Sequence, residues 1–587
     1  MVIRLFFLTT LFLSAQTNWP TWSGGNDGNR YSPLRQITKA NVKQLRVAWE
    51  FHSGDADARG RTMIQCTPSV IDGVLYGTSP TVMAFALDAA TGKELWRFDP
   101  TEVRSRGVNR GVMYWSSGPE KRVFFAAGTS LFALNAKTGK LIPEFGANGR
   151  IDMTKDLDRD PPGAFNGATS PGIVYKDLLI MGSSVGEGPR AAAPGHIRAY
   201  DVRTGKRRWI FHTIPHPGEF GYETWPKDAW KTIGGANNWG GMSLDEKRGV
   251  VYVSLGSPAF DFYGGDRVGD NLFGNAIVAL DAATGKRIWH YQTLHHDIWD
   301  LDLPVNPNLI QWNGRDAVAQ ITKQGFVFVL DRVTGKPLLP VEERPFPGSD
   351  MPGEVASKTQ PIPLKPPPFA PQKFEPNPAA PEVAKQIADL RNNGLYAPPS
   401  RQGTIVLPGT LGGGLWGGAA ASPSGALYIN SQNVASVHQL IDSAPNAPYP
   451  YALKGYTKIR DAAGNSGARP PWGLLTAIDL NKGDFQWQKV FGKSGVQAGQ
   501  ETGTENMGGP ALTASGLLFI GATRDEMFRA YDTATGEVLF EYKLPAGGYA
   551  TPAVYSVNGK QYIVIACGGG GRMTTKSGDA YVAFALP

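Results

Sequence analysis

The sequence contains only two cysteines, Cys66 and Cys567, among 587 residues. It has no Cys-x-x-Cys or Cys-x-x-Cys-His spacing and no cluster of cysteine with histidine. The common motifs for zinc, iron–sulfur clusters and covalently attached haem are therefore missing. The two thiols can pair only if the fold brings the two ends of the chain together.

Long apolar runs and dense charge are also missing. No stretch reaches 18 apolar residues, so the sequence predicts no membrane-spanning helix. Charged residues make up 19% of the chain, which excludes coiled coils. The 58 basic residues exceed the 51 acidic ones, but the excess is spread along the chain and forms no nucleic-acid-binding arm.

The first 15 residues have the pattern of a secretory signal peptide. Arg4 precedes a nine-residue apolar run, Leu5 to Leu13, and small Ala15 stands at the predicted cleavage site. We expect the mature domain to span 16–587 and to be exported, to the periplasm in a Gram-negative host. The alternative is that this run is an uncleaved, buried strand.

What the chain has in abundance is glycine, proline and aromatic residues. There are 72 Gly and 45 Pro, together with 15 Trp, 27 Phe and 20 Tyr. Disordered chains are poor in aromatic residues, so this composition indicates many short strands joined by tight turns.

One phrase recurs along the chain. It begins as Ala86-Leu87-Asp88 and continues through Thr91 and Gly92 to Trp96. Further copies lie around Asn135, Asp201, Asp281, Asp331, Asp479 and Asp532. Asp opens the turn by bonding its own backbone and Gly takes the positive φ, so each copy is strand, turn, strand. Two more strand-like runs precede each copy, which predicts the four-stranded blades of a β-propeller.

The ends of the chain supply the two halves of one further copy. The C-terminal run 582–586 is its first half, and the run 45–51 is its second half. Seven internal copies and this split copy predict an all-β, eight-bladed propeller, closed by pairing of the N- and C-terminal segments. Insertions at 337–400, which is rich in proline, and at 432–472 interrupt the pattern, and such long loops often shape a binding site.

The repeat resembles the tryptophan-docking motif of quinoproteins that use pyrroloquinoline quinone (PQQ). Asp270-Asn-Leu, the run from Trp289 to Asp300, the run from Thr322 to Asp331, Pro545-Ala-Gly-Gly and the ending Ala580–Pro587 resemble the glucose/quinate/shikimate dehydrogenase subfamily. This resemblance implies a PQQ-dependent dehydrogenase that oxidises a sugar, polyol or other alcohol. The alternative is a non-catalytic propeller that acts as a scaffold or binding protein.

The loops that follow second strands and enter first strands all point to one mouth of the predicted ring. Polar residues on these loops match cofactor-binding positions of the family, with Trp239 as the floor under PQQ and Trp115 as the ceiling. The other predicted cofactor-binding residues are Gln65, Arg110, Thr169, Ser184, Gly186, Asn237, Lys323, Asn430 and Asp525. The resemblance gives Lys323 a second role, which is to stabilise negative charge on the quinone.

The resemblance also implies a divalent cation, normally Ca²⁺, held by Glu187, Ser257 and Asp300. Relatives have Asn where this chain has Ser257, and Asp302 resembles the extra carboxylate of lanthanide-dependent relatives. Asp300 matches the catalytic base. Asp297, His295 and His296 remain alternatives for that role. Because the chain has no haem motif, the resemblance implies a separate electron acceptor, either a cytochrome c or membrane quinone.

Overall fold

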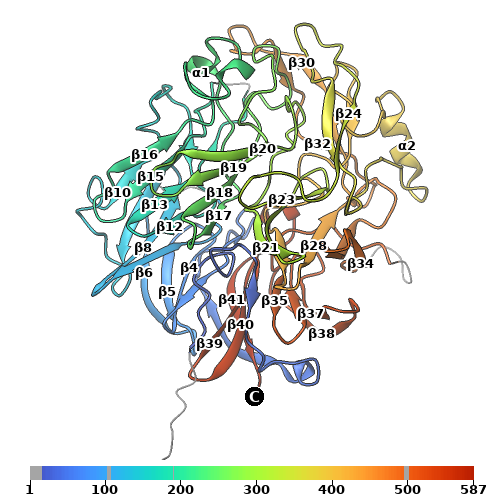
Figure 1. Cartoon of the computed structure of the whole chain (residues 1–587). Coiled ribbons are helices and arrows are strands. Elements are labelled where there is room, and N and C mark those ends of the chain that lie inside the picture. Colours follow the sequence, from blue (N-terminus) through green and yellow to red (C-terminus); the bar gives the residue numbers. More distant parts are fainter. Residues whose placement is uncertain (1–15, 102–106, 189–190, 495–500) are drawn as a thin grey trace, which may run out of the picture.

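The computed structural model describes residues 16–101, 107–188, 191–494 and 501–587, so the predicted signal peptide lies outside the described residues. The chain is built from short antiparallel sheets (Figure 1). In chain order, the first main sheets are β3–β6 (Ser69–Ile71, Val74–Thr78, Ala84–Asp88, Glu94–Phe98), β7–β10 (Met113–Ser117, Glu120–Ala127, Ser130–Asn135, Arg150–Asp152) and β12, β13, β15 and β16 (Ile173–Tyr175, Leu178–Met181, Ile197–Asp201, Arg207–Phe211). They are followed by β17–β20 (Met242–Asp245, Val250–Ser254, Ala276–Asp281, Arg287–Gln292), β21–β23 (Asn308–Trp312, Arg315–Ile321, Val327–Asp331) and β27, β28, β33 and β34 (Ala419–Ala421, Ala426–Gln432, Gly473–Asp479, Asp484–Val490). The last two are β35–β38 (Ala511–Thr513, Leu517–Ile520, Met527–Asp532, Val538–Lys543) and the sheet of β39–β41 with β2 (Ala553–Val557, Lys560–Gly569, Ser577–Ala585, Arg46–His52).

The sheets follow one another around a common centre (Figure 1). Their first strands contact each other in the order β7, β12, β17, β21, β27, β35, β39 and β3. The N-terminal strand β2 pairs antiparallel with the C-terminal strand β41, from Arg46 opposite Ala585 to His52 opposite Ala580. The fold is therefore an all-β propeller whose chain ends pair within one sheet, as predicted.

The repeated phrase joins neighbouring sheets. In the first copy, the Asp88 carboxylate accepts hydrogen bonds from Ala90 N and Thr91 N, at 3.0 and 2.9 Å, and Gly92 has φ +72°. Trp49 of the neighbouring sheet lies against Gly92 and donates through Nε1 to Ala89 O at 3.1 Å. The same Trp–Gly contact recurs at Trp96–Gly139, Trp209–Gly285, Trp289–Gly335 and Trp487–Gly536.

Not every sheet has the predicted four strands. The sheet β21–β23 has three, because after the turn at Asp331 the chain makes only an isolated bridge between Leu330 and Pro337. Proline has no N–H to donate, so the expected fourth strand does not continue. The sheet β35–β38 gains a fifth strand, β1 (Tyr31–Ser32), which pairs parallel to β35.

The two predicted insertions carry small elements of their own. Residues 337–400 contain the hairpin β24–β25 (Val341–Pro345, Thr359–Pro363) and helix α2 (Pro381–Ile387). Residues 432–472 contain β29 (Ser436–His438), β30 (Leu440–Asp442), β31 (Tyr451–Leu453) and β32 (Thr457–Lys458).

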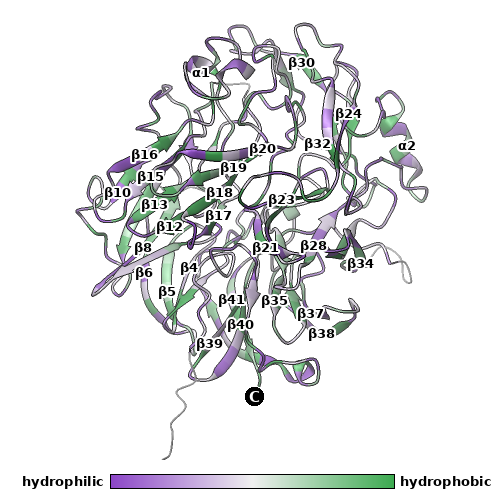
Figure 2. Cartoon of the chain, viewed as in Figure 1, coloured by the Kyte–Doolittle hydropathy of each residue, from purple (hydrophilic) through white to green (hydrophobic). Residues whose placement is uncertain are grey.

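The core lies within and between the sheets. Strands β18 and β19 are mostly hydrophobic and appear green in Figure 2, whereas the outer strand β6 buries only Trp96. Cys66 and Cys567 lie in the same apolar cluster, and both thiols are buried and free. Among the described residues, no helix is long and apolar enough to cross a membrane.

Candidate active site

A cavity of about 710 Å³ brings together polar residues from many loops. Eleven of the predicted site residues line it: Gln65, Arg110, Thr169, Ser184, Gly186, Glu187, Asn237, Trp239, Ser257, Asp300 and Lys323. These residues are as far apart in sequence as 65 and 323, so only the ring arrangement makes them neighbours. Their roles stay predictions, but their convergence in one cavity is a feature of the fold.

Lys323 lies between two buried carboxylates. Its Nζ donates to Asp300 Oδ1 at 2.7 Å, to Asp300 O at 2.8 Å and to Asp302 Oδ2 at 2.9 Å. Lys323 and Asp300 are 5 and 6% exposed. Buried charges are stable only when paired, so this ammonium and these carboxylates hold one another in place.

The pKa values of these groups reflect that arrangement. Burial raises the pKa of Asp300 well above its ordinary range, and the negative charges of Asp302 and Glu187 add to this effect, while Lys323 opposes it. Burial also disfavours the charged form of Lys323, but the two carboxylates outweigh it and raise the pKa of the ammonium. A carboxyl with a raised pKa is a stronger base than a solvated one, as proton abstraction requires.

Trp239 and Arg110 form one wall of the cavity. The Arg110 guanidinium lies 5.2 Å from the Trp239 ring and 4.8 Å from the ring of Trp416, which also lines the cavity. Arg110 Nη1 donates to Thr169 Oγ1 at 2.8 Å and to Ser170 Oγ at 3.1 Å, whereas its Nε is buried without a partner. Burial lowers the pKa of Arg110 to about 9, and the nearby Arg572 contributes to this.

Asp302 accepts hydrogen bonds from both Trp239 and Lys323. Its Oδ2 accepts from Trp239 Nε1 at 3.1 Å as well as from Lys323, and its Oδ1 accepts from Ser257 N at 2.6 Å. Both carboxylate oxygens are thus engaged by this chain. Asp302 therefore has the contacts of a positioning residue.

The rival base, Asp297, is occupied in the same way. It accepts hydrogen bonds from Trp299 N at 2.8 Å, Leu301 N at 2.9 Å, Asn275 Nδ2 at 2.9 Å and the Ser257 hydroxyl. His296 bonds Gly269 O and Glu354, and His295 bonds Gln292 and Glu343. None of these three alternatives lines the cavity, so Asp300 is the candidate base that does.

Three of the predicted cofactor-binding residues are not among those that line this cavity. Trp115 is buried in a core cluster that includes residues of β7 and β8, with Arg122 and Arg203 on its ring at 5.7 and 4.6 Å. On the pleated strand β7, Trp115 and its neighbour Tyr114 face opposite sides: Tyr114 packs toward the sheet β3–β6, and Trp115 packs toward the sheet of β12, β13, β15 and β16.

Asn430 and Asp525 are structural in their contacts. Asn430 Nδ2 donates to Asn506 Oδ1 at 2.8 Å and to Gly508 O at 3.1 Å, which joins β28 to the segment before β35. Asp525 forms an ion pair with Arg529 at 2.6 Å and lines a different, smaller cavity. Neither lines the cavity around Asp300.

The sequence interpretation also missed residues that do line the cavity. Asp261 follows Ser257 on the same loop, and Tyr456 comes from the insertion 432–472 and donates its hydroxyl to Glu187 Oε2 at 2.7 Å. Trp416, Arg61, Lys458 and Arg572 are also part of the wall. Asp261 had a detectable signal, because it is a lone carboxylate in the apolar run Ala259-Phe260-Asp261-Phe262-Tyr263. Tyr456 had none.

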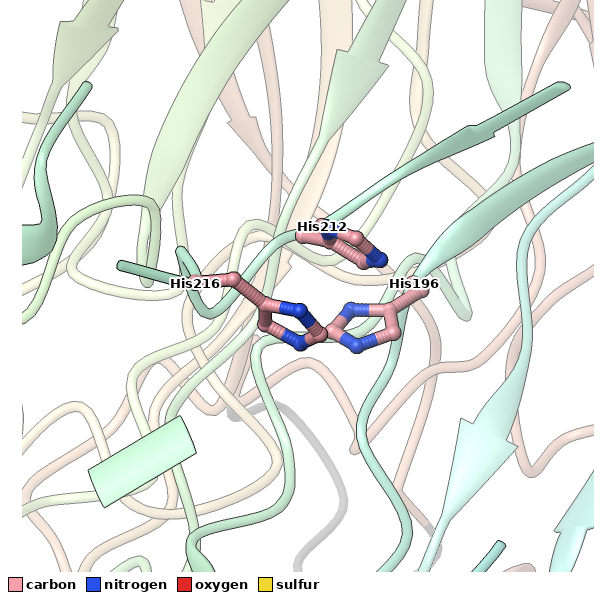
Figure 3. A group of neighbouring side chains, drawn as sticks. All are labelled: His196, His212 and His216. Atoms are coloured by element: carbon pink, nitrogen blue, oxygen red, sulfur yellow. The ribbon is translucent and has the colours of Figure 1, made fainter. Parts of the chain in front are cut away.

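Three of the eight histidines meet outside the cavity (Figure 3). The candidate ligand atoms of His196, His212 and His216 lie within 4.8 Å of one another. Both ring nitrogens of His212 face carboxylates, Glu219 at 2.8 Å and Asp158 at 3.2 Å, and its ring stacks on His216 at 3.8 Å. The Nδ1 atom of His196 lies 3.1 Å from the donor Thr213 N. These nitrogens already have hydrogen-bond partners, and two of the rings are stacked. We therefore interpret His212 as a charged histidine that connects neighbouring loops through Glu219 and Asp158, and not as one of three converging metal ligands.

Comparison with known proteins connects the site to a family. Residues 19–563 match the family model described as "PQQ: Glucose/ethanol/alcohol dehydrogenase, beta-propeller domain". Quinoprotein glucose dehydrogenase A of Acinetobacter calcoaceticus is 34% identical over 98% of this chain and 80% of that protein. Quinate/shikimate dehydrogenase (quinone) of Acinetobacter baylyi is 32% identical over 97% of this chain and 79% of its own length.

Solved structures agree with these sequence matches. Quinohemoprotein alcohol dehydrogenase ADH-IIG from Pseudomonas putida superimposes with a TM-score of 0.72 at 27% identity, covering 97% of this chain and 80% of that structure. A europium-containing methanol dehydrogenase has the same TM-score at 24% identity and supports the fold alone. The chain belongs to the PQQ-dependent dehydrogenase β-propeller family.

Proposed function

We propose that this protein is a PQQ-dependent dehydrogenase that oxidises the CH–OH group of a sugar, polyol or related alcohol. The observation that carries this proposal is the Asp300–Lys323–Asp302 group in the wall of a cavity above Trp239. A scaffold propeller has no need for buried, mutually paired charges in a cavity, since they cost desolvation energy. The non-catalytic alternative is therefore not favoured.

The residues around the cavity fit PQQ, a flat group with several carboxylates and carbonyls. A volume of about 710 Å³ lies in the range of small-ligand sites. Trp239 offers a flat aromatic surface, and Arg110 Nε and Gln65 Oε1 are buried without partners among the described residues. These orphaned polar atoms, with Thr169, Ser184 and Asn237 in the same wall, match a ligand rich in donors and acceptors.

In this proposal three residues of the cavity wall act directly in the reaction or hold the groups that do. Asp300 removes the proton from the substrate hydroxyl, and Lys323 stabilises negative charge that develops next to it. Asp302 keeps Lys323 and Trp239 in position through its hydrogen bonds. Bound PQQ supplies the oxidant that takes up the hydride from the substrate carbon.

The proposal includes a divalent cation, which we expect to be Ca²⁺. Glu187 and Asp300 would hold it, because carboxylate oxygens are the ligands that hard cations prefer. The Ser257 hydroxyl donates to Asp297, which leaves only its oxygen lone pairs for a metal. The metal would act as a Lewis acid on the bound quinone.

Three further expectations belong to this proposal. Electrons pass to a separate acceptor, a cytochrome c or membrane quinone, and the protein works in the periplasm. We also interpret the main sheets as eight blades of one ring.

The test separates cofactor binding from chemistry. The purified protein is loaded with PQQ and Ca²⁺, and dye reduction is followed with sugars and polyols. Trp239→Ala should weaken PQQ binding at least tenfold, because it removes aromatic stacking worth about 1–3 kcal/mol. Asp300→Asn should keep PQQ affinity but lower turnover by about 10² or more.

Two results would contradict the proposal. Wild-type protein that binds no PQQ would remove its basis. If turnover survives Asp300→Asn but is lost in Asp297→Asn, the catalytic base is Asp297 and the proposed assignment to Asp300 is wrong.

A further inference from the structure

Asp261 is a further carboxyl that faces the same cavity as the candidate base. Asp261 lines the cavity with Glu187, Ser257 and Asp300, and it is 3% exposed. Within the described residues, its side chain accepts no hydrogen bond and forms no ion pair, although its backbone N donates to Glu187 O at 3.4 Å. Asp302 and Asp297, by contrast, are saturated by partners from this chain.

An unpartnered buried carboxyl is costly to the folded protein. The carboxylates of Glu187 and Asp300 line the same cavity, so the nearest charged groups there are also negative. Among the residues that the structure describes, no cation forms an ion pair with Asp261, and Lys323 is bonded to Asp300 and Asp302 instead. A buried polar group without a partner costs about 1–3 kcal/mol, and the group has no packing role that an apolar side chain would not fill better.

The loop that carries Asp261 is held firmly, so the carboxyl has a defined position. Its neighbours Phe260 and Phe262 belong to an apolar cluster with Met351 of one insertion and Tyr449 of the other. The rings of Phe260 and Tyr449 lie 5.5 Å apart, and Phe262 lies 5.0 Å from His438. Both insertions therefore fix the position of Asp261 in the cavity wall.

We propose that Asp261 is a substrate-binding residue that accepts a hydrogen bond from a substrate hydroxyl other than the one being oxidised. This inference rests on the proposed function, in which Asp300 takes the reacting hydroxyl. Among the carboxyls that line this cavity, Asp261 is left without a partner near the candidate base and so matches a second hydroxyl of the same molecule, and the exposed phenol of Tyr456 lies beside Glu187 in the same wall. The substrate class is therefore a polyhydroxylated compound, and a monohydric alcohol leaves Asp261 without its partner.

The experiment compares polyhydric and monohydric probes. PQQ- and Ca²⁺-loaded wild type, Asp261→Asn and Asp261→Leu are assayed by dye reduction with glycerol, D-glucose, quinate and 1-propanol. We expect the wild type to favour at least one polyhydric probe over 1-propanol by tenfold or more in kcat/KM. Asp261→Leu should raise KM for that probe about 10- to 100-fold, because a buried substrate hydroxyl is left without its hydrogen-bond partner, with a smaller effect on kcat. Its kcat/KM for 1-propanol should stay the same or rise.

Matched controls separate this role from others. Asp270→Asn changes an exposed carboxylate nine residues further along the same loop and should leave the probe preference unchanged. PQQ affinity, measured by quenching of tryptophan fluorescence, should be equal in all variants and shows that the site is folded. Calorimetric titration with Ca²⁺ tests whether Asp261 binds the metal instead.

The outcomes distinguish the two proposals. If no probe is oxidised by PQQ-loaded wild type, the proposed function fails and this inference fails with it. If wild type is active but Asp261→Leu keeps the polyhydric preference, or if wild type favours 1-propanol, only the inference is overturned. A loss of Ca²⁺ affinity in Asp261→Asn would also overturn it, because the carboxyl would then be a metal ligand.

Discussion

At the residue scale, Asp302 holds several groups of the candidate site in position through hydrogen bonds. Its two oxygens receive the Trp239 indole, the Lys323 ammonium and the Ser257 backbone N–H. Because of these contacts, burial is outweighed and the pKa of Asp302 is lowered, so it stays ionised next to Asp300. Asp302 resembles the extra carboxylate of lanthanide-dependent relatives, and in this structure its hydrogen bonds connect Trp239 with Lys323 and Asp300.

His212 gives a prediction about pH and stability at the same scale. Burial disfavours its charged form, but hydrogen bonds to Glu219 and Asp158 outweigh this and raise its pKa. A group with a raised pKa in the folded state stabilises the protein below its unfolded pKa, and this contribution is lost as pH rises through the folded value. The carboxylates have lowered pKa values, so their part is lost only in acid.

We therefore expect His212→Gln to lower the free energy of unfolding by about 1 kcal/mol at pH 5.5, with the difference shrinking toward pH 9. Burial lowers the pKa values of His196 and His216 and so disfavours their charged forms, while Arg207 pairs with Asp158. Denaturant unfolding at several pH values measures the difference. His290→Gln is the control, since the pKa of His290 is lowered to about 4. A difference in the free energy of unfolding that grows with pH would contradict this role of the charged His212.

At the scale of elements, the turn glycines join one sheet to the next. A Cβ on Gly285 would lie 2.5 Å from the Trp209 ring, and Gly285 has φ +73°. Trp209 donates to Ala282 O at 3.2 Å in the same turn. Each tryptophan thus packs on a turn that only glycine allows to come so close.

Gly285→Ala should destabilise the protein through two effects. The left-handed conformation costs a non-glycine residue about 1–2 kcal/mol, and the clash with Trp209 adds about 1–3 kcal/mol. Gly314→Ala is the matched control, because Gly314 has φ +77° but an added Cβ would meet nothing within 4 Å. Thermal unfolding followed by circular dichroism should give a clearly lower Tm for Gly285→Ala than for Gly314→Ala, and equal values would show that the contact contributes little.

At the scale of the whole molecule, the pairing of β2 with β41 closes the ring. Without β41, both β2 and β40 have unpaired edges, and exposed edges pair with other chains. A chain that ends after Lys576 should therefore elute as aggregate in size-exclusion chromatography, while a chain that lacks only Leu586 and Pro587 should remain monodisperse. Monodisperse protein from the shorter chain would show that closure is not required.

Local chemistry explains how much of the fold the sequence could predict. The Asp–Gly turns and the tryptophan that follows them lie within about ten residues, so the sequence alone shows the repeat and the strands it connects. Once the strands are known, the loops that enter or leave them can be assigned to one mouth of the propeller. Most of the predicted residues on these loops, from Gln65 to Lys323, do line one cavity.

What the sequence by itself determined is therefore the propeller, its closure through the chain ends and the side of the ring on which the site lies. The tertiary structure decided which side chains reach the cavity. It placed Trp115 in a core and Asn430 and Asp525 in local networks, and it brought Tyr456 and Asp261 into the wall. The physical reason is that these positions depend on the pleat of a strand and on the packing of two long insertions, where contacts between residues distant in sequence, such as Phe260 with Tyr449, determine where a side chain lies.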